Sequence, residues 1–415
     1  MKYLLYFLAL ASLAACDSGM NMQSGSYKYL YDFESRELHP EYIIYHHRDD
    51  SSTIFFRIKS SELLYARGGS GSPFISKISL KITTTEIGGD RVDTSSLQIV
   101  DTAHERQGWL LGSMKLKMPQ GIWNVIVEFT DLTKNQTQPG FLIADKTTAY
   151  SGQNYLLKKF ETGEPIFGGF ATPGQMVEVE SERNKNKSLP KILHLIGEVK
   201  LPPPPFSTSQ PELPDLINST MITPQGSKGE MIFEVESGNY FVTHDVFLKS
   251  GITIKTSNSY YPEVRSVESL EWPLRYITTK SEHDDIVKNS YPKLMIDKFW
   301  LECGGDKEHA RELIKTYYRR VQEANYYFST YTEGWRTDRG MIHLIFGNPT
   351  KINRFNDAEN WQYGEDGSAG MLTFNFRKVE HPLSGNIYVL ERDPGFKTYW
   401  ERGVQNWRNG RVYNE

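Results

Sequence analysis

The sequence is poor in cysteine and has no strong excess of charge of either sign. Its 415 residues include two cysteines, too few for the disulfide framework of a small secreted domain. The formal net charge is -4 at pH 7. A protein that neutralises a phosphate backbone needs clustered positive charge, so this balance argues against general nucleic-acid binding.

The usual signatures of metal and cofactor chemistry are also missing. The sequence has no His-Glu-x-x-His motif, no paired-cysteine metal spacing, no Gly-rich phosphate loop and no Gly-x-Ser-x-Gly turn. The adjacent His46 and His47 fall in a predicted hairpin, where neighbouring side chains point to opposite faces and chelate one ion poorly. Cys303 is interpreted as a small structural apolar residue. We therefore expect no metal, no small-molecule cofactor and no enzymatic activity.

The N-terminal segment predicts an export signal and a lipid anchor. The apolar run Tyr3–Ala15 is shorter than the ~20 residues that span a bilayer as a helix. It leads into Leu13-Ala14-Ala15-Cys16, which resembles the lipobox of bacterial lipoproteins. The resemblance implies that residues 1–15 are a lipoprotein signal peptide, that Cys16 is lipidated, and that residues 16–26 are a flexible tether to the membrane. The alternative is an ordinary signal peptide with an incidental cysteine.

The residues after Cys16 bear on which side of the membrane the protein faces. Surface lipoproteins of the Bacteroidota resemble one another in an acidic cluster just after the lipidated cysteine. This chain has only Asp17 there. We therefore expect a protein anchored in the outer membrane and facing the periplasm.

Composition and strand patterns predict a multi-domain, strand-rich chain. Hydrophobic residues are 38%, charged residues 24% and aromatic residues 13% of the sequence. Short alternating segments predict one β-sandwich-like domain over residues 27–145 and a second over residues 146–265. A proline-rich loop, residues 201–214, interrupts the second domain. Its four consecutive prolines favour an extended, stiff and exposed loop, and the alternative is a docking ligand for an aromatic groove.

Residues 266–415 predict an α+β domain. Apolar residues at spacings of three and four indicate helix between residues 286 and 328, with Asp306 as an N-cap. A final amphipathic helix is expected over residues 396–407. Strands are expected at four places between these helices: Met341–Phe346, Trp361–Tyr363, Met371–Arg377 and Ile387–Leu390.

The α+β block carries the most specific motif of the chain. The run Gly334-Trp335-Arg336-Thr337-Asp338-Arg339-Gly340, followed by an apolar segment and Gly347-Asn348-Pro349, resembles the signature of the GWxTD-domain family of Bacteroidota envelope proteins. The segment Glu359-Asn360-Trp361-Gln362-Tyr363 resembles the family's downstream strand, and the resemblance covers residues 294–377. The family implies no catalytic activity. A weaker similarity to the SmpA/OmlA lipoproteins of outer-membrane assembly machinery favours an accessory role in an envelope complex.

The motif residues are predicted to serve structure or partner contact. Gly334 is expected to end a helix with a positive φ, and Gly340 to admit the chain into a strand. Thr337 and Asp338 are expected to bond nearby backbone amides, and Arg339 to pair with Asp338 or another carboxylate. Trp335 is expected to anchor the helix on the sheet. The complete set of motif residues comprises Gly334, Trp335, Thr337, Asp338, Arg339, Gly340, Gly347, Pro349 and Trp361.

A catalytic alternative uses the same segment, with Asp338 as base, Thr337 as nucleophile and Arg339 as anion clamp. It requires a third orienting group and a cleft, and no residue at a useful sequence spacing supplies that group. The favoured hypothesis is a non-enzymatic envelope lipoprotein, an accessory or docking subunit of an outer-membrane assembly or secretion complex. The alternatives are a glycan-binding or glycan-processing lipoprotein and a structural spacer.

Overall fold

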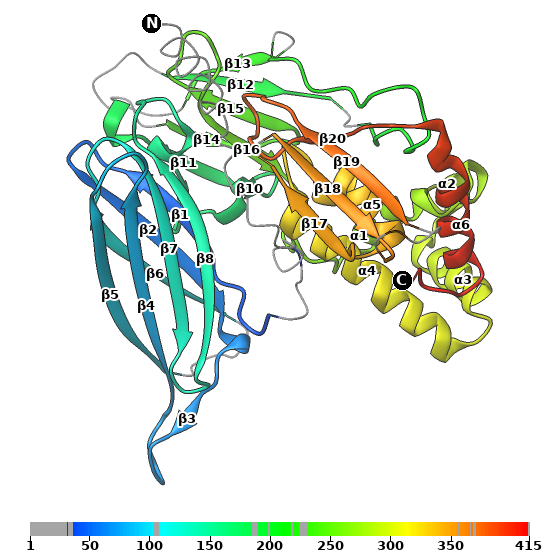
Figure 1. Cartoon of the computed structure of the whole chain (residues 1–415), viewed down its shortest axis with the longest axis horizontal. Helices are drawn as coiled ribbons and strands as arrows, with labels where there is room; N and C mark the ends of the chain where they lie inside the picture. Colours follow the sequence, from blue (N-terminus) through cyan, green and yellow to red (C-terminus); the bar gives the residue numbers. More distant parts are fainter. Residues whose placement is uncertain are drawn as a thin grey trace, which may run out of the picture.

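The computed structural model describes residues 31, 36–102, 108–184, 190–197, 200–216, 219–224, 231–355, 357–365, 367 and 371–413. The predicted signal peptide, Cys16 and the tether lie outside these residues. The chain forms two β-rich blocks and a C-terminal α+β region (Figure 1). Among the described residues, no helix combines the length and apolar character that crossing a membrane requires.

The first β-rich block is a sandwich of two antiparallel sheets. One sheet has the order β1-β2-β6, and in the other β4 pairs with β3, β5 and β7, while β7 also pairs with β8. Alternate residues of the strands, such as Ile54, Phe56, Val125 and Val127, face inward and form the core. The strands are β1 (Glu41–His46), β2 (Ser51–Lys59), β3 (Ala66–Arg67), β4 (Phe74–Glu86), β5 (Val92–Thr102), β6 (Trp109–Lys117), β7 (Ile122–Asp131) and β8 (Gln136–Asp145).

The second β-rich block also has two sheets around one core. Their orders are β10-β16-β15-β12-β13 and β14-β11-β9, and Val177, Ile192, Phe233 and Val242 lie between them. The strands are β9 (Leu156–Lys159), β10 (Phe170–Ala171), β11 (Met176–Glu180), β12 (Lys191–Leu195), β13 (Thr220–Ile222), β14 (Met231–Glu234), β15 (Asn239–Thr243) and β16 (Ile252–Thr256). The prediction of two β-sandwich-like blocks ahead of an α+β region is therefore confirmed.

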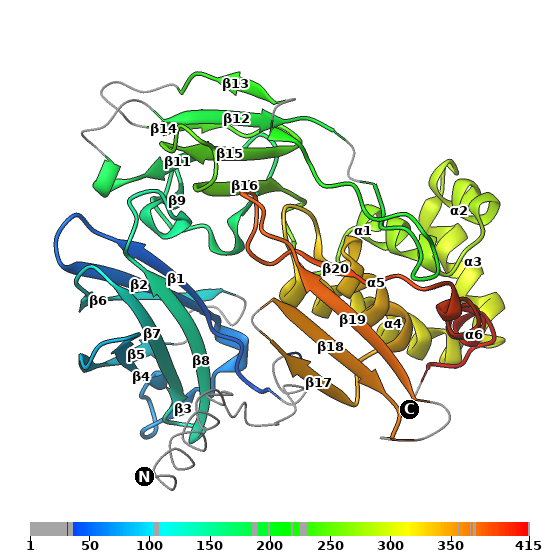
Figure 2. The same ribbon diagram turned by 45° about the horizontal axis from the view of Figure 1, so that its top comes forward.

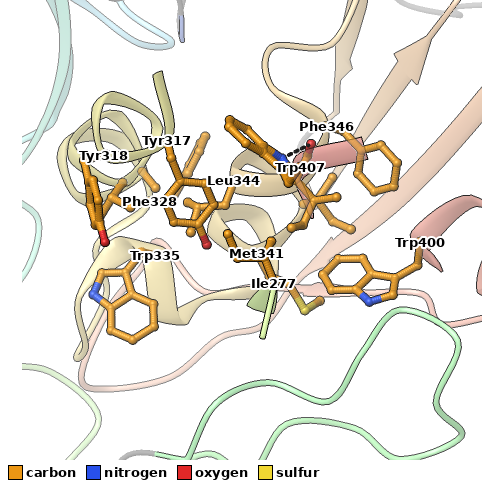
Figure 3. Packing of buried hydrophobic residues seen from close by; sticks show 14 of the residues in the cluster. Ile277, Tyr317, Tyr318, Phe328, Trp335, Met341, Leu344, Phe346, Trp400 and Trp407 are labelled. Atoms are coloured by element: carbon orange, nitrogen blue, oxygen red, sulfur yellow. Dashed lines mark hydrogen bonds between the residues drawn. The ribbon is translucent and has the colours of Figure 1, made fainter. Parts of the chain in front are cut away.

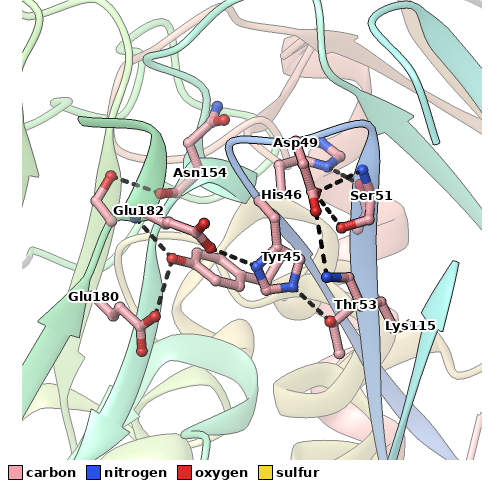
Figure 4. Close-up of polar contacts among 12 residues, drawn as sticks. Tyr45, His46, Asp49, Ser51, Thr53, Lys115, Asn154, Glu180 and Glu182 are labelled. Atoms are coloured by element: carbon pink, nitrogen blue, oxygen red, sulfur yellow. Dashed lines mark hydrogen bonds and ion pairs between the residues drawn. The ribbon is translucent and has the colours of Figure 1, made fainter. Parts of the chain in front are cut away.

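Polar contacts join the two β-rich blocks beside the β1–β2 hairpin (Figure 4). The backbone amide of Glu182 donates to the Tyr45 hydroxyl at 2.8 Å, and the Glu182 carboxylate lies 2.7 Å from His47 Nδ1. His46 instead contacts Ser52, at 2.8 Å, so the two histidines face different partners. Nearby, the buried Lys146 ammonium donates to three backbone carbonyls, those of Asp49, Ser51 and Met118, at 2.7, 2.6 and 3.0 Å. These bonds fix the hairpin against the start of the second block.

The C-terminal region packs helices on one face of an antiparallel sheet with the order β17-β18-β19-β20 (Figure 2). The helices are α1 (Val267–Glu271), α2 (Lys280–Val287), α3 (Pro292–Gly304), α4 (Lys307–Phe328), α5 (Asp338–Phe346) and α6 (Lys397–Arg408), and short 3-10 turns include η7 (Trp272–Tyr276) and η8 (Gly334–Arg336). The strands are β17 (Lys351–Arg354), β18 (Ala358–Tyr363), β19 (Leu372–Lys378) and β20 (Tyr388–Leu390). Asp306 caps α4 as predicted, by accepting from the His309 amide at 2.8 Å.

Residues 341–346 are helical, so the strand predicted there is wrong. Every residue of α5 is buried, so the helix has no polar face to reveal a 3.6-residue period. An apolar run of this length does not distinguish a buried strand from a buried helix. Figure 3 shows the reason for the burial: Met341, Leu344 and Phe346 of α5 lie in the middle of the core, beside Phe328 of α4 and Trp407 of α6. Trp407 Nε1 donates to the Ile345 carbonyl at 3.2 Å.

The second β-rich block and the C-terminal region share an apolar cluster. Phe241 of β15 and Leu193 of β12 lie in one cluster with Tyr331, Leu383 and Ile387. The C-terminal region therefore covers the outer face of the five-stranded sheet around Phe241 and Leu193, whereas Met221 on the neighbouring β13 is 66% exposed.

The proline-rich segment lies against the C-terminal region. Arg392 Nη2 donates to the Pro203 carbonyl at 2.9 Å, and the Asp393 amide donates to the Pro205 carbonyl at 3.1 Å. Leu201 and Phe206 pack against the C-terminal core. The prediction of an exposed loop is therefore wrong for residues 201–206. The segment instead packs against the C-terminal region of its own chain, and the alternative of a docking ligand for an aromatic groove stays a prediction.

Candidate functional site

The two glycines of the signature allow backbones to approach closely. A Cβ on Gly334 would overlap the Ala324 carbonyl oxygen of α4, and a Cβ on Gly340 would overlap the Gly334 carbonyl oxygen. Gly334 is not among the described glycines with a positive φ, and Gly340 lies in α5. The predicted helix-ending and strand-entering roles are therefore wrong. Both residues are glycine because α4, η8 and α5 meet without room for a side chain.

Thr337 is the N-cap of α5. Its Oγ1 accepts from the Gly340 amide at 3.1 Å and donates to the Gly334 carbonyl at 2.7 Å. The predicted bond to a nearby amide is confirmed, and it satisfies an otherwise unpaired donor in the first turn of the helix. At the other end Gly347, with φ of 78°, closes α5, and its carbonyl accepts from the Tyr363 hydroxyl at 2.9 Å. The buried Pro349 follows this turn.

Trp335 fixes η8 against the helices. Its ring is buried and makes an edge contact with Tyr276 of η7 at 6.1 Å between centroids. Its Nε1 donates to the Glu333 carboxylate at 2.9 Å. Trp335 therefore packs with η7 and α4, in the same core as Phe328 (Figure 3), whereas the prediction places its contact on the sheet.

Asp338 forms a buried ion pair with Arg392. Both side chains are 1% exposed, and Arg392 Nη1 donates to Asp338 Oδ2 at 3.1 Å. The Leu390 amide donates to the same oxygen at 2.8 Å. Burial raises the pKa of Asp338, and the Arg392 guanidinium opposes that rise. Asp338 therefore ties α5 to β20 and to the residue that holds the proline-rich segment.

Arg339 pairs with a different carboxylate, that of Glu359 on β18. Its Nη1 lies 3.3 Å from each Glu359 oxygen, and its Nη2 donates to the Asn386 carbonyl at 2.9 Å. Trp361 Nε1 donates to Glu359 Oε2 at 3.2 Å. The Arg339 and Glu359 side chains are 2% and 0% exposed, so the pair lies away from solvent. Of the two predicted partners for Arg339, the structure shows the second, another carboxylate.

A residue that the sequence reasoning missed completes this pair. Tyr31 is 8% exposed, and its hydroxyl donates to Glu359 Oε1 at 2.7 Å. Arg339 Nη1 lies 3.3 Å from the same hydroxyl. The Tyr31 ring contacts Phe328 and Trp361 at centroid distances of 5.0 and 5.9 Å. Burial raises the pKa of Tyr31 well above its usual value, so the phenol remains a hydrogen-bond donor. We call Tyr327, Phe328, Arg339, Glu359 and Trp361 the phenol socket.

The residues of the catalytic alternative do not converge on a reaction centre. Thr337 is engaged as a cap, Asp338 pairs with Arg392, and Arg339 pairs with Glu359. His343 lies in α5, with its Nε2 2.9 Å from Glu323, and not on an adjoining strand. Among the described residues, no group of three or more His, Cys, Asp or Glu side chains is arranged to hold a metal ion.

A small cleft lies beside the signature. Its volume is about 160 Å³, and its lining includes Tyr261, Trp272, Glu333, Trp335 and Arg336. The Arg336 guanidinium already lies over the Trp335 ring at 4.5 Å and pairs with Glu333 at 3.0 Å. A cavity of ~150 Å³ accepts a benzene-sized group, whereas ligand pockets usually exceed ~300 Å³. The cleft therefore has room for one side chain and not for a typical metabolite.

Cys303 lies partly buried against the C-terminal core. Burial raises the pKa of its thiol to about 11. The thiol is therefore protonated at neutral pH, as expected for a structural cysteine and not for a nucleophile.

Comparison with protein-family models matches the GWxTD domain to residues 238–409. Comparison with curated proteins finds no match. The matched range contains α1–α6, the sheet β17–β20 and the whole signature segment. It begins at residue 238, before the boundary predicted at 266, and so includes β15 and β16 of the second β-rich block.

Proposed function

We propose that this chain, which carries a GWxTD domain over residues 238–409, is a non-enzymatic lipoprotein of the outer membrane. In this proposal acyl chains on Cys16 hold the protein on the membrane, and its body faces the periplasm. It serves as an accessory or docking subunit of an outer-membrane assembly or secretion complex. The resemblance of its signature to Bacteroidota envelope proteins and the lipobox-like Leu13–Cys16 support the location.

The contacts made by the signature residues support a structural role for the domain. The polar side chains of the signature are engaged in contacts within the protein: Thr337 caps a helix, while Asp338 and Arg339 each pair with a buried partner of opposite charge. A catalytic base or nucleophile has to reach a substrate in a cleft. The segment instead holds α4, α5 and the sheet together, which favours a scaffold over a reaction centre.

The observation that favours a binding partner is an apolar patch on the first β-rich block. We define the outer patch as Ile122, Ile126, Phe141 and Ile143, all of which are exposed. Phe141 and Ile143 on β8 are 62% and 60% exposed, and Ile126 pairs with Phe141 across β7 and β8. Val92 of β5 is exposed in the same outward row as Ile143, but Thr85 and Asn124 lie between them, so it stands outside the patch. Contiguous exposed apolar side chains on a folded protein favour contact with another protein.

The test is a pull-down of the tagged, lipidated protein from native outer membranes in gentle detergent, read by mass spectrometry. We expect stoichiometric recovery of a β-barrel or secretion component, and loss of that recovery in Cys16→Ala. Phe141→Asp should weaken the recovery, because it places a charge in the outer patch. Val100→Asp is the matched control, because Val100 is 61% exposed on the same face but at the opposite end of β5 from Val92.

Recovery of the protein alone would contradict a stable complex. The favoured hypothesis would then be a glycan-binding lipoprotein or a spacer. Binding to a panel of envelope glycans distinguishes these two. Equal recovery with Phe141→Asp and with the wild-type chain would keep the complex but exclude the outer patch as its contact.

A further inference from the structure

The phenol socket joins two parts of the chain that are far apart in sequence. Tyr31 is separated by 308 residues from Arg339 and by 328 residues from Glu359, and it contacts both. It follows directly on the segment that begins at Cys16. The first described residues after it, from Arg36 onwards, lead into the first β-rich block, where Leu38 is part of the core. The chain therefore contacts the C-terminal region, through Tyr31, at a point in the sequence that precedes the first sandwich.

The chemistry of the socket is selective for a phenol. Its walls are the rings of Tyr327, Phe328 and Trp361, at centroid distances of 5.5, 5.0 and 5.9 Å from the Tyr31 ring. Its floor is the Glu359 carboxylate, which is 0% exposed and is held by Arg339. An aromatic ring fills the apolar walls, and a hydroxyl donates to the buried carboxylate. A site built to bond a hydroxyl rejects the analogue that lacks it, because the buried acceptor then loses a partner.

We infer that the phenol socket is a binding site for a tyrosine side chain supplied by a separate segment, and that Tyr31 is its resident ligand in cis. The socket ties the segment after Cys16 to the C-terminal region. At ~3.3–3.6 Å per residue, the chain from Cys16 to Tyr31 reaches at most about 54 Å. If Cys16 is acylated as proposed above, the C-terminal region is held within that distance of the membrane. The site itself is independent of the lipid, so it can be tested without a membrane.

The first experiment is limited trypsin digestion of the chain from residue 16 onwards, carrying Cys16→Ala. Mass spectrometry follows cleavage after Lys28 and Arg36. Because proteolysis follows the population of the open segment, Tyr31→Ala should be cleaved at least tenfold faster than the parent chain. Tyr31→Phe should fall between them, since it keeps the ring and loses the bond to Glu359. Tyr29→Ala is the matched control from the same segment and should be cleaved at the parent rate.

Equal cleavage of Tyr31→Ala and the parent chain would overturn the inference, as would equal acceleration by Tyr29→Ala and Tyr31→Ala. Circular dichroism of each variant monitors the fold. If Tyr31→Ala loses its fold, the comparison of Tyr31→Phe with Tyr29→Ala decides, and equal rates for these two would overturn the inference.

The second experiment supplies the ligand in trans. A peptide of residues 24–36 is added to the Tyr31→Ala chain while tryptophan emission is followed, because Trp361 forms one wall of the socket. We expect saturable binding below about 1 mM, the effective concentration of a short flexible linker. The same peptide with phenylalanine at position 31 should bind at least tenfold more weakly. No saturable binding, or equal binding of the two peptides, would refute a phenol site. A failed pull-down would contradict the proposed complex and leave this result standing.

Discussion

Replacing Gly334 with alanine is the sharpest test of why the signature has its glycines. A Cβ at this position would overlap the Ala324 carbonyl oxygen and would stand 2.8 Å from the Asn325 Cα, inside the 3.0 Å that real Cβ atoms respect. Both obstacles are backbone, so no side chain can rotate away. The turn η8 must therefore move off α4.

The expected loss follows from the bonds that this movement breaks. The Gly334 carbonyl accepts from Thr337 Oγ1 at 2.7 Å, and the Trp335 amide donates to Asn325 Oδ1 at 3.4 Å. Overpacking costs ~1–3 kcal/mol, and each of the two buried polar groups left unpaired costs ~1–3 kcal/mol, so Gly334→Ala should lower stability by roughly 3–9 kcal/mol. In a region of this size, where 1 kcal/mol shifts the thermal midpoint by about 2–4 °C, that loss lowers the midpoint by about 6–36 °C.

The assay is thermal unfolding followed by tryptophan fluorescence. Gly68→Ala is the control, because nothing lies within 4 Å of a Cβ built there and its φ is not positive. It should change stability by less than ~1 kcal/mol. A Gly334→Ala midpoint equal to that of the Gly68→Ala chain would refute the close-approach explanation.

Three further perturbations test other contacts. Asp338→Asn leaves the buried Arg392 without its counter-ion and should lower stability by ~3 kcal/mol or more, read as the midpoint of urea unfolding; an unchanged midpoint would contradict the pairing. The Arg408 side chain lowers the pKa of Glu282 to about 2, so this pair stabilises the contact of α2 with α6 above pH 4.5, and the stabilisation is lost as the pH falls towards 2. The thermal midpoint should therefore depend less steeply on pH over that range in Arg408→Gln than in the parent chain. An identical slope would count against the pair. Lys146→Met removes the donor for three carbonyls and should lower stability by ~2 kcal/mol or more in calorimetry, whereas an unchanged transition would show that water replaces the ammonium.

Regular periodicity made most of the fold predictable. The strand β11 has one buried face and alternates with period two, which is the pattern that predicts strands in this block, whereas β15 is buried at four consecutive positions and lacks that alternation. The amphipathic pattern of α4 likewise gave its N-cap at Asp306. The helix α5 could not be predicted, since burial on all sides removes the period that separates a helix from a strand.

The candidate site was predictable only where partners are close in sequence. Thr337 as a cap depends on residues three positions away, and that contact was expected. The partners of Asp338 and Arg339 lie 54 and 20 residues away, so charge alone could not select Arg392 or Glu359. Tyr31 was missed because its contacts exist only after the chain has folded across its whole length. The available signal was the alternation of Tyr27, Tyr29 and Tyr31 in a stretch that otherwise follows a polar tether.

The shared cluster around Phe241 bears on what counts as a module in this protein. The family match starts at residue 238 and takes β15 and β16, but β12, which pairs with β15, lies outside it. A fragment cut at that point would keep Phe241, Leu383 and Ile387 and would lose Leu193 from the same cluster. It would also lose the proline-rich segment that Arg392 holds. The range that the family model matches is therefore shorter than the set of residues that pack around it, and we expect a transplanted domain to be more stable when it carries β12 and the proline-rich segment.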